Sequence, residues 1–319
     1  MAHMIEMIDG VAQIAYVGET PWHGLGKQVK PDISPIEMLD AAGLNWSVVK
    51  VPAYANIGGK DIKLDHSALV RDSDNKILDV ITEDWNPCQN KEAFEFFNDF
   101  VSAGDMQMHT AGSLRGGKMV WALAKVNDGF ELFNGDQVDS YMLFTNPHIY
   151  GQSIDVRFTP IRVVCNNTLT LSLNSAASQM VKVSHRREFN AEEVKSMLGV
   201  AHNKLTTYKE MASFLGSKRY TEEKLVEYFS NVFPISSMKK EKTKEISRNA
   251  KIALDLIEQQ PGAQYAEGSY WQAFNTVTFM TDHIIGRSAD ARLQSAWFGA
   301  NKSLKTKALE TAIDFAQAA

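Results

Sequence analysis

The chain has 319 residues, of which 44% are hydrophobic, 10% aromatic and 22% charged, close to the average of soluble globular proteins. This length corresponds to about two domains, and the apolar content argues against wholesale disorder. The 33 Lys and Arg residues against 38 Asp and Glu residues give a formal net charge of −5. Such a balance excludes a histone-like protein that holds nucleic acid by bulk charge.

Two further features bear on the cellular setting. The two cysteines, Cys88 and Cys165, are too few for a disulfide framework, so a reducing, cytoplasmic environment is expected. No apolar run approaches the roughly 18 residues of a membrane span, and residues 4–9 are acidic where a signal peptide would be basic. We therefore expect no membrane partner.

The first half of the chain is predicted to consist mainly of strands. Ser34 before Pro35 predicts a short helix, and Asn90 predicts the N-cap of a second helix that ends at Gly104. The turn-forming residues 72–75 predict a hairpin between the strands on either side. Strands are expected over residues 46–51, 68–70, 77–81, 118–126, 141–145 and 154–159.

Helical periodicity begins near residue 190. Helices are expected over residues 190–216, from Thr221 to Pro234, and over 237–260, 270–283, 289–298 and 304–316. Strands followed by helices favour an α+β fold, here an antiparallel β-meander with bracing helices followed by an α-helical C-terminal region. The expected domains are an α+β core over residues 4–188 and a helical domain over residues 189–319.

Charge is distributed unevenly along the sequence. Residues 1–110 carry 8 basic and 17 acidic side chains, a net charge of −9, whereas residues 181–251 carry 15 basic and 9 acidic ones, a net charge of +6. Because a local field guides a polyanion to a surface, the basic segment points to nucleic acid as a partner.

The segment Gly112–Lys118 has the spacing of a phosphate-binding loop, Gly-x4-Gly-Lys. That loop needs Ser or Thr next and must open a helix, but here Met119 follows and the sequence continues as a strand. A glycine-rich β-turn is therefore predicted, whose Arg115 and Lys118 can still contact a phosphate backbone.

Several basic residues are candidates for nucleic-acid binding. Arg157 and Arg162 flank the end of a predicted strand, and with Arg115 and Lys118 they could form a groove in which guanidinium groups hold phosphates. Ordinary exposed cations on solvated faces are the alternative interpretation. The basic segment adds Arg186, Arg187, Lys239, Lys240 and Lys242 to the candidates.

No catalytic constellation stands out. The histidines show no metal-ligand spacing such as His-x3-His, and Cys165 in an apolar neighbourhood is expected to be structural. The enzyme alternative is a metal-assisted hydrolase that uses His23, His148 and Asp155. We predict no cofactor, and we expect a protein without covalent chemistry.

Five motifs resemble one known family. They are Pro21–Gly26, Gly112–Gly117, Val120–Lys125, Phe158–Leu169 and Ser295–Gly299, spread over nearly the whole chain. Together they are similar to the lateral-transfer "phage/plasmid-like protein" family, which is built on a domain of unknown function. The resemblance implies carriage on phages, prophages and plasmids, and it supplies no catalytic residues.

A remoter analogy concerns residues 34–103. Their predicted order of helix, strand, strand-turn-strand and helix resembles the core of single-strand annealing recombinases of the Redβ/RecT type, which phages commonly encode. The analogy implies a protein that binds single-stranded DNA, promotes annealing in recombination and forms a homo-oligomer. A non-enzymatic anti-restriction or host-takeover protein is a third possibility.

Overall fold

The computed structural model describes residues 5–21, 24–133, 135–162, 167–168, 180–235, 246–287, 292, 295–296 and 299–319. The chain forms two compact units, and each unit is made of three separate segments of the sequence. The first unit comprises Met1–Asp128, Tyr141–Phe158 and Ala177–Ala201, and the second comprises Gly129–Ser140, Thr159–Ala176 and His202–Ala319. The expected division at residue 188 stays a prediction. The α+β class, with antiparallel strands and a C-terminal helix, is confirmed.

The largest sheet has the strand order β12-β11-β10-β9-β8-β3-β4, with β13 paired to β11. The pairings of β11 with β12 and β13, of β8 with β9 and of β3 with β8 are antiparallel, whereas β3 and β4 pair in parallel. A separate two-stranded sheet joins β1 and β2. The strands are β1 Met7–Ile8, β2 Val11–Ala12, β3 Ile14–Val17, β4 Lys27–Val29, β8 Met106–Leu114, β9 Met119–Leu132, β10 Asp136–Pro147, β11 Ile154–Arg162, β12 Asn167–Thr168 and β13 Met180–Val183.

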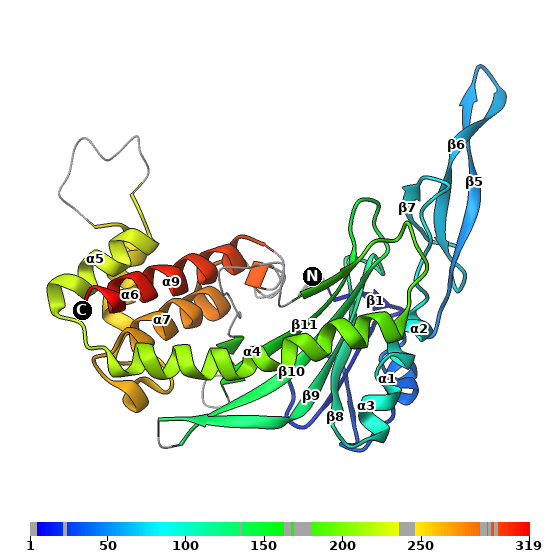
Figure 1. The fold of residues 1–319 in the computed structure, drawn as a ribbon. Coiled ribbons are helices and arrows are strands. Elements are labelled where there is room, and N and C mark those ends of the chain that lie inside the picture. Colours follow the sequence, from blue (N-terminus) through cyan, green and yellow to red (C-terminus); the bar gives the residue numbers. More distant parts are fainter. Residues whose placement is uncertain are drawn as a thin grey trace. The chain divides into compact units, whose positions relative to one another are not determined.

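Three short helices pack in the first unit beside the strand β8 (Figure 1). They are α1 Pro35–Ala41, α2 Asn90–Glu95 and α3 Asn98–Ser102. The predicted start of α1 is confirmed, since Ser34 forms a capping box with Glu37 and Pro35 is the first helical residue. Phe96 and Phe97 of the α2–α3 corner pack on Phe144 of β10, with ring centroids 5.3 and 6.1 Å away.

A second sheet consists of β5 (Val48–Ile57), β6 (Lys60–Arg71) and β7 (Ile77–Ile81), all antiparallel. The predicted hairpin around residues 72–75 is its β6–β7 connection. The β5–β6 hairpin is much longer than predicted, and Figure 1 shows it extending beyond the rest of its unit. Pro52 is compatible with β5 because β5 is an edge strand.

The second unit is built mainly from helices. The predicted long helix is confirmed as α4 (Ala191–Ser217), which begins in the first unit, and Thr221 caps α5 (Glu222–Val232). The others are α6 Arg248–Leu256, the 3₁₀ helix η2 Ala263–Ala266, α7 Tyr270–Phe279, the π-helix η3 Met280–Ile284 and α9 Ala300–Gln317. Of the helix expected over 237–260, residues 237–245 lie outside the described residues, and α6 begins at Arg248, where Ser247 accepts a hydrogen bond from the Ala250 amide as N-cap.

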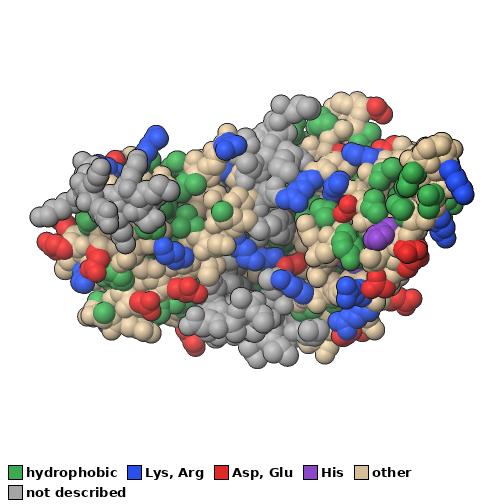
Figure 2. Space-filling model, turned by 90° about the horizontal axis from the view of Figure 1, so that it is seen from above, with side chains coloured by type: hydrophobic (Ala, Val, Ile, Leu, Met, Phe, Trp, Pro, Cys, Tyr) green, Lys and Arg blue, Asp and Glu red, His purple; other side chains and the backbone are tan. Residues whose placement is uncertain are grey.

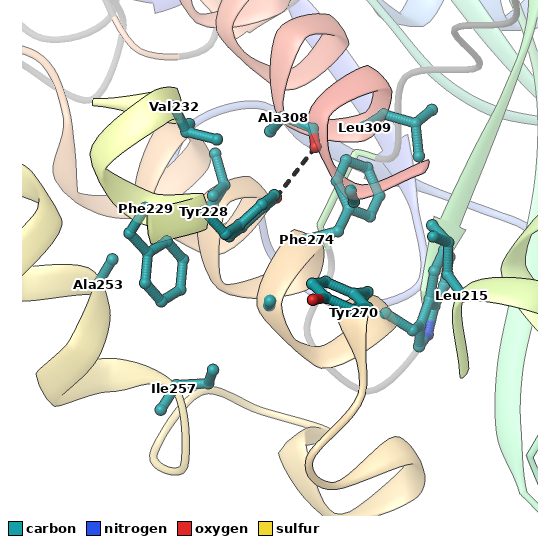
Figure 3. Packing of buried hydrophobic residues seen from close by; sticks show 14 of the residues in the cluster. Leu215, Tyr228, Phe229, Val232, Ala253, Ile257, Tyr270, Phe274, Ala308 and Leu309 are labelled. Carbon is teal, nitrogen blue, oxygen red and sulfur yellow. Dashed lines mark hydrogen bonds between the residues drawn. The ribbon is translucent and has the colours of Figure 1, made fainter. Parts of the chain in front are cut away.

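Aromatic side chains form the core of the second unit (Figure 3). Tyr228 of α5 is fully buried and donates a hydrogen bond to the carbonyl oxygen of Ala308 in α9, at 3.0 Å. Phe133, at the end of the β9–β10 hairpin, packs against this core, and its ring lies directly against Gly216 of α4. A Cβ at position 216 would lie 2.0 Å from the Phe133 ring, so this contact requires glycine.

The Tyr228 contact gives a test of this core. Tyr228→Phe removes one buried hydrogen bond and keeps the ring, so we expect the free energy of unfolding to fall by about 1 kcal/mol. Urea denaturation followed by circular dichroism measures the change. Tyr54→Phe is the control, because Tyr54 is exposed on the β5–β6 hairpin and should leave stability unchanged. Equal stability of both variants would contradict the buried hydrogen bond.

Candidate functional site

The β8–β9 turn brings cationic side chains together. Arg115, Gly116 and Gly117 all have positive φ, of 54°, 67° and 90°. A Cβ at Gly116 would lie 2.6 Å from Nζ of Lys76, and one at Gly117 would lie 2.7 Å from Nη1 of Arg71. The two glycines therefore allow the turn to lie directly against these cations. Because β9 continues from Met119 as a strand, the prediction of a glycine-rich turn in place of a phosphate-binding loop is confirmed.

A network of buried ion pairs and hydrogen bonds lies against this turn. Arg71 is 1% exposed and donates from Nη1 to both carboxylate oxygens of Glu6, at 2.9 and 3.0 Å. Its Nε and Nη2 donate to Asp74 at 2.9 and 2.6 Å. The hydroxyl of Ser113 donates to Glu6 at 2.9 Å, and Lys76 lies 3.4 Å from Glu6. One strand end, one turn and the N-terminal segment are thereby held together.

Electrostatics within the network favour the charged forms of Arg71 and Asp74. The hydrogen bonds to Asp74 raise the pKa of Arg71 in spite of burial, and the same contacts lower the pKa of Asp74 to about 2. In the turn next to this network, Arg115 is exposed and Lys118 is half-buried. The turn therefore carries two cationic residues beside a network that contains Arg71 and Lys76 together with the carboxylates of Glu6 and Asp74.

Arg186 and Arg187 follow β13, in a segment anchored by His185. The backbone amide of Asn86 donates to the His185 carbonyl at 2.5 Å, and the His185 ring stacks on the Trp85 ring with their centroids 4.1 Å apart. Arg186 lies 3.3 Å from Asp84 and Arg187 lies 3.1 Å from Glu193, and all four side chains are about half exposed or more. Exposed ion pairs of this kind contribute only about 0–1 kcal/mol, so a phosphate can replace either carboxylate.

Arg157 is held differently. Its guanidinium makes two hydrogen bonds to Asp155, two residues earlier on β11, through Nε at 2.7 Å and through Nη2. The side chains are only 13% and 10% exposed. A bidentate pair with so little solvent contact favours a structural role for Arg157.

The remaining basic candidates cannot be placed. The structure describes the backbone of Arg162 at the end of β11 but not its side chain. Lys239, Lys240 and Lys242 lie outside the described residues. Figure 2 shows Lys and Arg side chains interspersed with Asp and Glu on the face in view, so the described cations form no continuous basic surface there.

A buried polar cluster lies next to the turn and was not predicted. The amide of His148 donates to the Lys118 carbonyl at 2.8 Å, and the His148 ring is fully buried. The side-chain amide of Asn90 donates to the carbonyls of Leu44 and Trp46, at 3.1 and 3.4 Å, so its oxygen is left to accept. Nε2 of His148 lies 3.0 Å from that oxygen and must therefore carry the proton.

This arrangement leaves two polar ring atoms without a hydrogen bond among the described residues. They are Nδ1 of His148, which carries a lone pair in this tautomer, and Nε1 of Trp46. The two rings lie 5.3 Å apart. Asn90 was predicted to be an N-cap, but it is the first helical residue of α2 and its side chain joins this cluster, while Gln89 takes the N-cap position.

The predicted metal site gains no support from the structure. His23 lies outside the described residues, Asp155 is bound to Arg157, and His148 is buried against Asn90. Over the described part of the chain, no three His, Cys, Asp or Glu side chains cluster as metal ligands would. Burial raises the pKa of the Cys88 thiol well above its usual range, which makes it a poor nucleophile.

The histidine cluster predicts a pH dependence. Burial, and to a lesser extent the charges of His185 and Arg71, lower the pKa of His148 to about 3. The unfolded chain binds a proton near pH 6.5 that the folded chain does not, so stability should be complete above pH 6.5 and fall as the pH drops towards 3. The loss from His148 is at most about 1.4 kcal/mol per pH unit.

Urea denaturation between pH 7 and pH 4.5 measures this slope. His148→Gln retains a donor for Asn90 but cannot be protonated, so its slope should be smaller than that of the wild type. His66→Gln is the matched control, because His66 is exposed on the β5–β6 hairpin. An unchanged slope in His148→Gln would refute the assignment.

No curated protein and no solved structure matches the chain. Among the described residues, no helix is long and apolar enough to cross a membrane. Residues 77–297, more than half of the chain, match the domain of unknown function DUF932. This segment contains the β8–β9 turn, His148 and Arg186, and the chain therefore belongs to the DUF932 family.

Proposed function

We propose that this protein binds single-stranded DNA through its phosphates and promotes strand annealing in recombination, as a homo-oligomer and without covalent chemistry. In keeping with the resemblance described above, we propose that phages or plasmids carry it. The observation that carries the proposal is the β8–β9 turn, which contains Arg115 and Lys118 and whose Gly116 and Gly117 lie directly against Lys76 and Arg71.

The electrostatics of the turn suit a phosphate backbone. Arg71 and Lys76 balance the charges of Glu6 and Asp74, so the network next to the turn adds no net negative charge near Arg115 and Lys118. Arg186 and Arg187 belong to the same unit, and their exposed carboxylate partners can be exchanged for phosphates. An annealing protein needs only such reversible phosphate contacts, because the bases must stay available for pairing.

The order of elements supports the same proposal. The chain runs from α1 through the meander β5–β6–β7 to α2 and α3, which is the helix, strand, strand-turn-strand, helix order on which the annealing analogy was based. Since fold analogy alone does not establish function, the decisive evidence must come from binding.

A salt series provides the test. The double variant Arg115→Ala, Lys118→Ala should bind a fluorescent oligo(dT) more weakly than the wild type, in fluorescence anisotropy between 25 and 300 mM NaCl. Loss of two phosphate contacts should reduce the slope of log affinity against log salt by about 1.4. Lys91→Ala, Lys224→Ala is a charge-matched control on exposed helix positions and should keep the wild-type slope.

Two outcomes would contradict the proposal. One is the absence of binding to single-stranded DNA at 25 mM NaCl. The other is a slope that falls equally in the control variant, because binding would then follow net charge alone. Annealing of two complementary oligonucleotides, followed by fluorescence quenching, separates strand pairing from simple binding.

A further inference from the structure

The three-stranded sheet β5–β6–β7 has one unusually apolar exposed face. Cross-strand pairing places alternate residues of each strand on this face, which we call the meander face. It consists of Val49, Val51, Ala53, Ala55 and Ile57 of β5, Lys60, Ile62, Leu64, His66, Ala68 and Val70 of β6, and Ile77 and Val80 of β7.

Large apolar side chains are exposed on the meander face, whereas the side chains at the base of the opposite face are buried. At the base of the hairpin, Val48, Leu69 and Arg71 point to the other face and are buried. On the meander face, Ile57 is 64% and Ile77 is 62% exposed. Eight of the thirteen exposed large hydrophobic side chains among the described residues lie on β5–β7. In Figure 2, hydrophobic side chains gather at the right-hand end, where β5–β7 lie in Figure 1.

The dimensions of this face indicate a real contact surface. Ten residues of β5 at about 3.3 Å each and three strands spaced about 4.8 Å apart give an area on the order of 400 Å². The largest apolar patch on a typical monomer measures roughly 300–600 Å² and is often functional, and this face has that size. Two such faces stacked together bury about 800 Å² in total, which lies below the roughly 1,200–2,000 Å² of specific, stable interfaces and fits only a weak, reversible association.

We propose that the meander face binds the same face of a second copy of this chain. An apolar face needs an apolar partner, and the other exposed large hydrophobic residues of the described chain are spread over β1, β2, α5 and two loop or π-helical positions. Among the described residues, the only surface that matches the meander face is therefore the meander face itself, which is the condition for a two-fold, isologous contact.

Charge also favours a second copy. The chain is acidic overall, so most surfaces of two copies repel one another. On the meander face, whose residues are all described, the only Lys, Arg, Asp or Glu side chain is Lys60 at the hairpin tip, and the only other ionisable side chain is His66. Two copies can therefore stack without bringing like charges together over most of the contact. This inference rests on the proposed function only for its biological use, and its test needs no DNA.

Light scattering and analytical ultracentrifugation of the full chain between 1 and 100 µM provide the test. The wild type should associate reversibly into dimers or larger multiples of two. The triple variant Val51→Thr, Ile62→Thr, Val80→Thr keeps β-branched side chains and net charge, and it should raise the dissociation constant at least ~100-fold. Tyr54→Thr, an exposed change on the opposite face, should leave association unchanged.

A wild-type monomer at 100 µM would overturn the inference, as would a triple variant that is folded by circular dichroism and associates like the wild type. Oligo(dT) binding by the same proteins separates this inference from the proposed function. Self-association through the meander face without DNA binding would leave the inference standing and remove the proposed function. DNA binding by a protein that stays monomeric would remove this inference and the proposed homo-oligomer, and would leave the proposed DNA binding standing.

Discussion

The buried pair between Glu6 and Arg71 is the constraint on which the candidate site depends. Both side chains are almost completely removed from water, and an unpaired charge in such a position costs several kcal/mol. Glu6 comes from the N-terminal segment, Arg71 from the end of β6 and Ser113 from the end of β8. Because the Glu6 carboxylate accepts hydrogen bonds from both Arg71 and Ser113, these three segments meet at one point. The glycine turn then has a fixed place against Arg71 and Lys76.

Local signals in the sequence were sufficient for much of the secondary structure. Ser34 and Pro35 predicted α1 because capping and the fixed φ of proline act within one turn of helix. The turn chemistry of residues 72–75 predicted the β6–β7 hairpin in the same way. The stripe from residue 194 onward predicted α4, since one face of a long helix repeats often enough to be recognised. Each of these features depends on neighbours in the chain.

The features that were missed depend on distant contacts. In residues 60–66 of β6 only Ile62 and Leu64 alternate with polar side chains, and both faces of the outer hairpin are exposed, so this short pattern did not lead to a predicted strand. Asn90 has the composition of an N-cap, but the carbonyls that bind its side chain come from residues about 45 positions away. The acidic partners of Arg186 and Arg187 could not be predicted for the same reason. The sequence shows how many cations the chain has, but the carboxylates that pair with them are determined by tertiary contacts.

One strand connects the two surfaces discussed above. Along β6, Leu69 and Arg71 point inward and Ala68 and Val70 point to the meander face, as the two-residue period of a strand requires. A shift of one residue in its pairing would expose the guanidinium of Arg71 and bury the alanine and valine in its place. The ion pair with Glu6 strongly disfavours that shift, since it would leave a buried carboxylate without its main partner. The buried charge thus secures both the base of the cationic turn and the side on which the apolar residues appear, and a change to the pair should affect the two surfaces together.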